Sequence, residues 1–156
     1  MTIENRLVVG IDGSEGSRRA LRWAVLEAAR TDAVVQVVAV WDWNGIDGSI
    51  DNAVNPEHAH ERAERTLAEV VDEVIAETGT HAAVLAETMR GDPPPVLVRA
   101  AAGARLLVLG SHGHSRLRQT LLGSVVEECI RVASCPVLVV PTERPALKSP
   151  EAAAAE

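Results

Sequence analysis

Residues suited to binding an anion are concentrated between positions 110 and 124, where they recur as Gly110-x2-Gly113-x9-Gly123-Ser124. Glycine has no Cβ, so its backbone N–H group can approach a phosphate closely. Gly123 and Ser124 also open an apolar helical pattern, and the first N–H groups and the dipole of a helix favour an anion. Either glycine pair alone is better explained as a turn or a helix cap. Together, they favour a site for a polyphosphate.

A carboxylate, Asp12, follows an apolar run that ends at Ile11, and it opens a loop that reaches Ser17. A carboxylate beside an anion site would repel bare phosphate. Asp12 therefore suits accepting a hydrogen bond from a hydroxyl group of the same ligand, or helping to hold Mg²⁺ through an oxygen ligand. The other interpretation is that Asp12 caps the next helix, a role that Ser14 or Ser17 can also take.

The elements that must position these residues are visible as an alternation of apolar runs and helical patterns. Runs that are apolar on both faces suit buried parallel strands, whereas apolar residues every three or four positions suit helices. Strands are expected over residues 6–12, 34–42, 82–88, 105–110 and 136–140. The first helix should follow the loop 12–17 and end near residue 32, and three further helices should cover residues 57–78, 94–102 and 122–133. This alternation predicts an α/β fold with a doubly wound, five-stranded parallel sheet and helices on both faces.

Doubly wound sheets bind ligands at the carboxyl ends of the strands, where the strand order reverses. If the strand order is 3-2-1-4-5, that point lies between the first and fourth strands. The loops at that point are 12–17 and 110–124. Asp12 and the glycine pattern are therefore expected to meet at one crevice.

Length and composition exclude several classes of protein. The chain of 156 residues suits one domain, expected over 1–142 and followed by a flexible tail over 143–156. A net charge of −7 and only three aromatic residues, all tryptophan, argue against nucleic acid as a partner. The apolar runs are too short to cross a membrane and no export signal is seen, so we expect a cytoplasmic protein. Cys129 and Cys135 form no CxxC pair and suit small buried hydrophobes.

Other phosphate and catalytic motifs are missing from the sequence. The single lysine, Lys148, stands near the C-terminus, away from any Walker A pattern, and neither Gly-x-Gly-x-x-Gly nor Gly-x-Ser-x-Gly is present. His112 and His114 lack a third ligand for zinc, and are interpreted as phosphate donors or solvated loop residues. Arg116 is the nearest cation for a terminal phosphate. Because no base is placed to activate water, fast hydrolysis of a bound polyphosphate is not expected.

The glycine spacing resembles the ATP-binding signature of the universal stress protein family. Three further segments also resemble that family: residues 8–14, 107–113 and 135–141. The similarity runs from about Arg6 to Pro141, which is nearly the whole chain, and is far more specific than an isolated glycine pattern.

The resemblance implies roles for individual residues. Gly110, Gly113, Gly123 and Ser124 should contact the phosphates and ribose of ATP, and Asp12 should lie at the ribose or near a phosphate-bound Mg²⁺.

The adenine end of the implied site involves different residues. Val40 should meet adenine through its backbone, and Gly91 should border the adenine pocket. Trp41 either covers the adenine or closes the edge of the core, which is the commoner role, and Trp23 is expected to pack in the core.

The resemblance also implies a homodimer, paired through the edge strand Val137–Val140 between Pro136 and Pro141. The leading functional hypothesis is a stress-response module whose nucleotide state alters a dimer surface. The alternatives are a slow ATPase or nucleotide-transferring enzyme, and a nucleotide-free dimerisation scaffold. An intact glycine signature argues against the scaffold.

Overall fold

Five apolar runs pair as one parallel sheet in the order β3-β2-β1-β4-β5, which confirms the predicted topology. The computed structural model describes residues 4–42, 55–113 and 122–142. The strands are β1 (Arg6–Ile11), β2 (Val34–Trp41), β3 (Ala83–Arg90), β4 (Leu106–Gly110) and β5 (Val137–Val140). The helices are α1 (Glu15–Thr31), α2 (Pro56–Thr78), α3 (Pro93–Ala100) and α4 (Ser124–Val132). The 143–156 tail expected from the sequence lies outside the described residues.

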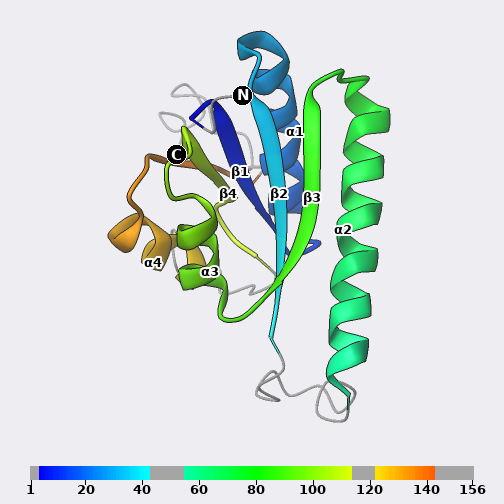
Figure 1. Cartoon of the computed structure of the whole chain (residues 1–156), viewed down its shortest axis with the longest axis vertical. Coiled ribbons are helices and arrows are strands. Elements are labelled where there is room, and N and C mark those ends of the chain that lie inside the picture. Colours follow the sequence, from blue (N-terminus) through cyan, green and yellow to red (C-terminus); the bar gives the residue numbers. More distant parts are fainter. Residues whose placement is uncertain (1–3, 43–54, 114–121, 143–156) are drawn as a thin grey trace, which may run out of the picture.

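The helices form two layers, one on each face of the sheet (Figure 1). Helices α1 and α2 pack on the face that carries Leu7, Val9 and Val37, while α3 and α4 pack on the face that carries Val8 and Leu107. Both layers are built mainly from Ala, Val and Leu, whose short side chains let the helices lie close to the sheet. This two-sided burial explains why the central strands are apolar on both faces over most of their length, with Arg6 of β1 and Gln36 of β2 as polar exceptions.

Helix α1 begins with a serine cap. Ser14 is the N-cap residue, and its Oγ accepts a hydrogen bond from the Ser17 N–H at 3.2 Å. The Ser14 N–H and Oγ–H both donate to Asp12 Oδ1, at 2.9 and 2.5 Å. Asp12 therefore orients the cap instead of being the cap itself.

Replacing Ser14 by alanine is expected to lower the free energy of unfolding by about 1 kcal/mol, because the N–H groups of the first turn of α1 lose their side-chain acceptor. Chemical denaturation with circular dichroism measures the difference. Ser134 is an exposed serine outside the helices, so Ser134→Ala is the matched control and should stay within about 0.5 kcal/mol of wild type. Equal stability of Ser14→Ala and Ser134→Ala would contradict the role of the cap.

Helix α3 begins without a side-chain cap. Asp92 occupies the N-cap position, but its side chain makes no capping hydrogen bond. The next three residues are Pro93, Pro94 and Pro95, and proline has no N–H group to donate. The sequence correctly places Asp92 before the helix, but the expected cap cannot form because its donors are missing.

Two further expectations can be compared directly with the structure. The helical period predicts Ile130 on the buried face of the last helix, but its side chain is 48% exposed, like that of Val132 at 56%. Among the described residues, no helix combines the length and the apolar character needed to span a membrane.

Candidate functional site

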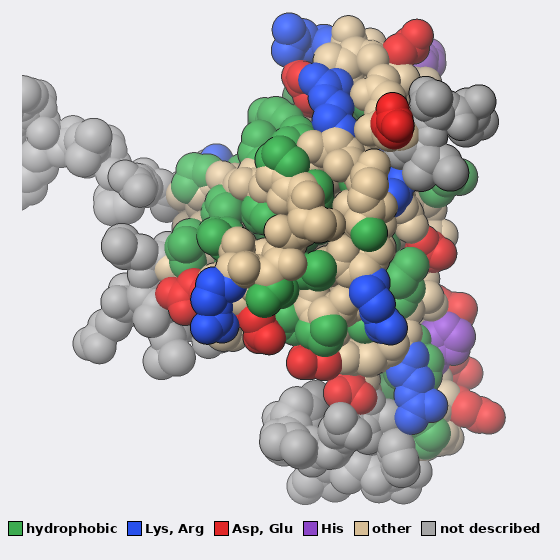
Figure 2. Space-filling view, turned by 60° about the vertical axis from the view of Figure 1, so that its left-hand side comes forward, with side chains coloured by type: hydrophobic (Ala, Val, Ile, Leu, Met, Phe, Trp, Pro, Cys, Tyr) green, Lys and Arg blue, Asp and Glu red, His purple; other side chains and the backbone are tan. Residues whose placement is uncertain are grey.

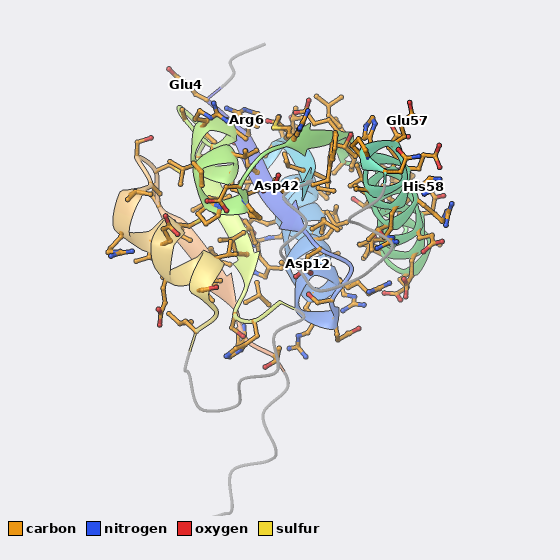
Figure 3. All side chains as sticks on the ribbon, turned by 90° about the horizontal axis from the view of Figure 1, so that it is seen from below. Glu4, Arg6, Asp12, Asp42, Glu57 and His58 are labelled. Atoms are coloured by element: carbon orange, nitrogen blue, oxygen red, sulfur yellow. The ribbon has the colours of Figure 1, made fainter. Side chains whose placement is uncertain are left out.

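A cavity of about 180 Å³ lies at the carboxyl ends of β1 and β4, where the strand order reverses. Figure 3 views the molecule from below and labels Asp12, which follows β1. The lining residues are Gly10, Ile11, Asp12, Ser14, Ser17, Val38, Val40, Pro93, Leu97, Leu109, Gly110, His112, Gly113, Val125 and Val126. The structure therefore brings four of the predicted site residues together: Asp12, Val40, Gly110 and Gly113.

The polar side of the cavity is formed by the β1–α1 loop and by the residues that follow β4. Asp12 binds Ser14 through Oδ1. Its Oδ2 lies on the side of Gly113, because a Cβ built on Gly113 would clash with that oxygen. Arg18 of α1 supports the loop by donating to the Gly13 carbonyl. Asp12 thus supports the helix cap and also presents a carboxylate oxygen toward the glycine segment.

Gly110 is required by packing inside the protein. A Cβ on Gly110 would lie 2.5 Å from the carbonyl carbon of Gly16, 2.6 Å from its oxygen and 2.9 Å from its Cα. These are backbone atoms in the first turn of α1, so they cannot move aside as a flexible side chain would. In turn, a Cβ on Gly16 would lie 2.7 Å from the His112 carbonyl oxygen. The start of α1 and the end of β4 therefore interlock through two glycines.

Gly123 differs from Gly110 because nothing in the fold requires a glycine there. Its backbone has φ −68° and ψ 158°, which any residue adopts readily. A Cβ on it would lie 3.4 Å from the Ser111 carbonyl oxygen and 3.6 Å from His112 Cα, which are ordinary contact distances. That Cβ would occupy the space beside the segment after β4. The missing side chain therefore keeps open a space next to the cavity.

The start of α4 supplies donors beside this space. Gly123 is the N-cap residue of α4, and it has no side chain to accept from the N–H groups of the first turn. Val125 and Val126 of that turn line the cavity. With Gly123 keeping the space open, this helix terminus has the features of an anion-binding site.

Val40 lies on the apolar side of the cavity, and its backbone faces the crevice. The Trp41 carbonyl accepts from the Gly91 N–H at 2.9 Å, so the backbone polar groups of Trp41 face β3. Along a strand, the backbone N–H and C=O groups of one residue face the opposite side from those of the next residue. The backbone polar groups of Val40 therefore face β1. Strand β1 ends at Ile11, the partner of Ala39. The Val40 carbonyl therefore points past the end of β1.

The remaining predicted residues border the cavity or lie outside the described residues. Gly91 adopts φ +141° just after β3, and the cavity lining includes Pro93 but not Gly91. Gly123 and Ser124 stand at the start of α4, next to the lining residues. Arg116 lies outside the part of the chain that the structure describes, as do His114, Trp43 and Lys148.

Trp41 packs against other side chains of the protein. Its ring stacks on that of His60 with centroids 4.8 Å apart, and the Arg90 guanidinium lies 5.5 Å from the Trp41 centroid. His60 Nε2 also lies 3.0 Å from Thr88 Oγ1. These contacts support the interpretation that Trp41 closes the edge of the core, and Trp23 packs against the core as expected.

The side chains that could bind a metal ion, including the two cysteine thiols, form no further site in the part of the chain that the structure describes. There, no group of three His, Cys, Asp or Glu side chains gathers to hold a metal ion. Cys129 is buried, and burial raises the pKa of its thiol to about 11. Burial also raises the pKa of the Cys135 thiol. Cys129 therefore packs as a small hydrophobe, as expected from the sequence.

Sequence reasoning misses several residues that build the site. The sequence indicates only a capping role for Ser17, yet this serine is buried and lines the cavity. Pro93 and Leu97 bring α3 to the apolar side of the cavity. Gly16 gives no local signal, because its partner, Gly110, is remote in sequence. For Ser17, the available signal is a serine on the buried face of an amphipathic helix directly after the loop.

Comparison with known proteins places this geometry in context. The model of the universal stress protein family matches residues 4–141. Universal stress protein Rv2624c of Mycobacterium tuberculosis is 32% identical over 134 residues, which cover 86% of this chain and 47% of that protein. A universal stress protein of Mycolicibacterium smegmatis is 31% identical over 146 residues, covering 88% and 48%. The chain thus spans about half the length of the curated relatives it matches.

Solved structures show the same fold. A universal stress protein in complex with cAMP is 29% identical with a TM-score of 0.68, covering 91% of this chain and 100% of that one. The universal stress protein of Archaeoglobus fulgidus in complex with dAMP is 25% identical with a TM-score of 0.65, covering 88% and 98%. Hypothetical protein MJ0577 has a TM-score of 0.74 at 24% identity, covering 92% and 100%, which supports the fold alone. Together with the family model, these matches show that the chain belongs to the universal stress protein family.

Proposed function

We propose that this chain binds ATP with Mg²⁺ in the cavity at the switch point, and that it acts in the cytoplasm as a nucleotide-dependent stress-response module. The observation that carries the proposal is the backbone at Gly123, where the fold would accept a side chain but the glycine leaves space beside a helix N-terminus. Two relatives of the same fold are complexes with the adenine nucleotides cAMP and dAMP, which supports a nucleotide as the ligand.

The two sides of the cavity suit the two ends of a nucleotide. The phosphates would lie against the segment after β4 and the start of α4, where backbone N–H groups and the helix dipole favour negative charge. Arg116 would lie near the terminal phosphate. The base would lie between Val40, Leu97 and Val126, whose side chains are apolar. Orientation of the base then depends on backbone groups, because these side chains offer no hydrogen bonds.

The Val40 carbonyl gives a reason for choosing adenine. A carbonyl that points past the end of β1 can accept a hydrogen bond from the amino group of adenine. Guanine carries a carbonyl oxygen at the corresponding position, which would leave two acceptors facing each other. The loss of one hydrogen bond of about 1.5 kcal/mol corresponds to roughly tenfold weaker binding of GTP.

Isothermal titration calorimetry of the whole chain with ATP, ADP and GTP, with and without Mg²⁺, tests the proposal. We expect saturable ATP binding in a 1:1 ratio per chain, and weaker binding of GTP. Mass spectrometry of ligand released from the denatured protein gives an independent check on which nucleotide is carried through purification. If ATP neither binds nor raises the melting temperature, the proposal is wrong.

Asp12→Asn is expected to reduce the benefit of Mg²⁺ for ATP binding. Asparagine keeps an oxygen that can accept from Ser14, so the helix cap is retained, but the negative charge that favours a cation is lost. Calorimetry with and without Mg²⁺ should show a large Mg²⁺ effect in wild type and little in the variant. An equal loss of affinity under both conditions would instead assign Asp12 to the ribose hydroxyls.

The same proposal includes a homodimer formed through β5. This strand is at the edge of the sheet, and its four side chains are only partly buried. Ile130 and Val132 of α4 are also exposed. Figure 2 turns the α3–α4 side of the molecule forward and shows hydrophobic side chains gathered there. An apolar edge strand invites pairing with a second copy.

Val139→Pro is expected to yield a monomer. The Pro136 and Val140 carbonyls accept from β4 and from Ser111 just after it, so the backbone polar groups of Val139 face away from β4 and toward the open edge. Proline at such a position removes an outward donor without breaking the pairing with β4. Light scattering should give the mass of two chains for wild type and of one chain for the variant. A dimeric variant with unchanged affinity would exclude β5 as the interface.

A further inference from the structure

Ser111 is a junction between the cavity and the end of β5. It is 6% exposed and directly follows β4. On the cavity side, its carbonyl accepts from the Gly123 N–H at 2.8 Å, and its Oγ lies 3.2 Å from His112 Nδ1. On the β5 side, its N–H donates to the Val140 carbonyl at 2.9 Å, and its Oγ accepts from the Thr142 N–H at 3.2 Å.

The Ser111 hydroxyl is the part of this junction that a substitution can remove cleanly. The two backbone hydrogen bonds remain whatever the side chain is. The hydroxyl accepts from the Thr142 N–H through a lone pair, and its own proton can be donated to His112 Nδ1. It therefore joins a residue that lines the cavity to the residue two positions beyond β5.

We propose that Ser111 couples nucleotide binding in the cavity to pairing of a second copy along β5. This inference rests on the proposed function, including the β5 dimer. Phosphates held by His112, Gly113 and the start of α4 would stabilise the contacts of Ser111 with His112 and Gly123. A second chain paired along β5 would stabilise its hydrogen bonds with Val140 and Thr142. Both events favour the same hydrogen-bonded arrangement, so ATP tightens the dimer. By linkage, dimerisation tightens ATP binding by the same factor.

The test is the dimer dissociation constant of the full chain, measured by analytical ultracentrifugation with and without Mg²⁺-ATP. For wild type we expect ATP to lower this constant by about tenfold, within the usual range for coupled sites. For Ser111→Ala we expect ATP binding and dimerisation to persist, but the effect of ATP on the dimer to fall below about twofold. The quantity to compare is the ratio of the dimer dissociation constant without ATP to that with ATP. A merely structural role of Ser111 would weaken both ATP binding and dimerisation and leave this ratio unchanged.

Ser17→Ala is the matched control, because it removes another buried hydroxyl from the cavity lining. The Ser17 hydroxyl donates to the Ser14 carbonyl within the start of α1. ATP affinity can change in this variant, but the ratio of dimer constants should stay at the wild-type value. Ser111→Thr keeps the hydroxyl and should also keep the ratio.

Thr142→Pro removes the same link from its other end, since it deletes the donated N–H while leaving Ser111 intact. It decides the question if Ser111→Ala does not fold, and it should likewise reduce the ratio below about twofold. Coupling that persists in folded Ser111→Ala or Thr142→Pro overturns the inference, as does a wild-type protein that binds ATP but whose dimer constant is the same with and without ATP. Failure of wild type to bind ATP overturns the proposed function, and this inference with it.

Discussion

Gly123→Asp is expected to abolish ATP binding while leaving the protein at least as stable as wild type. Aspartate is among the best N-cap residues, so its carboxylate should accept from the N–H groups at the start of α4. The same carboxylate would fill the space that glycine leaves open and would face the phosphates. Two like charges about 4 Å apart near a protein surface repel by about 4 kcal/mol, which corresponds to roughly 1,000-fold weaker binding.

The measurement pairs calorimetric titration with ATP and thermal melting of the free protein. Ser134→Asp adds the same charge at an exposed residue away from the cavity lining and should bind ATP nearly as wild type does. Strong ATP binding by Gly123→Asp would show that the phosphates do not lie at the start of α4. A large loss of stability would instead show that the glycine serves the fold.

Gly110→Ala is expected to have the opposite effect and to destabilise the fold itself. The new Cβ would lie 2.5 Å from a backbone carbon of Gly16, so β4 and α1 must move apart. Overpacking against backbone atoms should lower the free energy of unfolding by about 3 kcal/mol. For a domain of this size, that corresponds to a decrease of about 6–12 °C in melting temperature.

Gly123→Ala is the matched control for Gly110→Ala, because the chemical change is the same but the new Cβ meets only ordinary contacts. Its stability should fall by less than about 1 kcal/mol, the usual cost of alanine at an N-cap. Thermal melts of the two variants side by side test this contrast. Similar melting temperatures would mean that the interlock between α1 and β4 yields more easily than its geometry indicates.

The α/β architecture could be predicted from the sequence because it depends on local patterns, and the position of the cavity follows once the strand order 3-2-1-4-5 is assumed. Five apolar runs separated by helical patterns leave few topologies, and the right-handed crossover rule narrows them further. The glycine spacing and Asp12 then fall at the one place where doubly wound sheets bind ligands. The pattern alone therefore predicts that Asp12 and Gly113 meet at one crevice, and both residues do line the cavity.

The features that could not be predicted depend on contacts between residues remote in sequence. Nothing near Gly16 indicates that it meets Gly110, because the contact arises only when α1 packs across the end of β4. Ile130 follows the apolar period of its helix yet lies exposed at its margin. Whether the Val40 carbonyl faces β1 or the space beyond it depends on where β1 ends, and a hydrophobic pattern does not define a strand end to one residue.

The three prolines that open α3 bear on which way round a nucleotide can lie. Two helices, α3 and α4, begin beside the cavity, and Pro93 of α3 is part of its lining. A helix whose first three residues are all proline presents no N–H donors at its start, whereas the first turn of α4 has its full set. The cavity thus has one helix end that can solvate phosphate and one that cannot. If the chain binds a nucleotide as proposed, turning that nucleotide end for end would place its phosphates at the start of α3, where these N–H donors are missing, so the prolines would favour a single binding orientation.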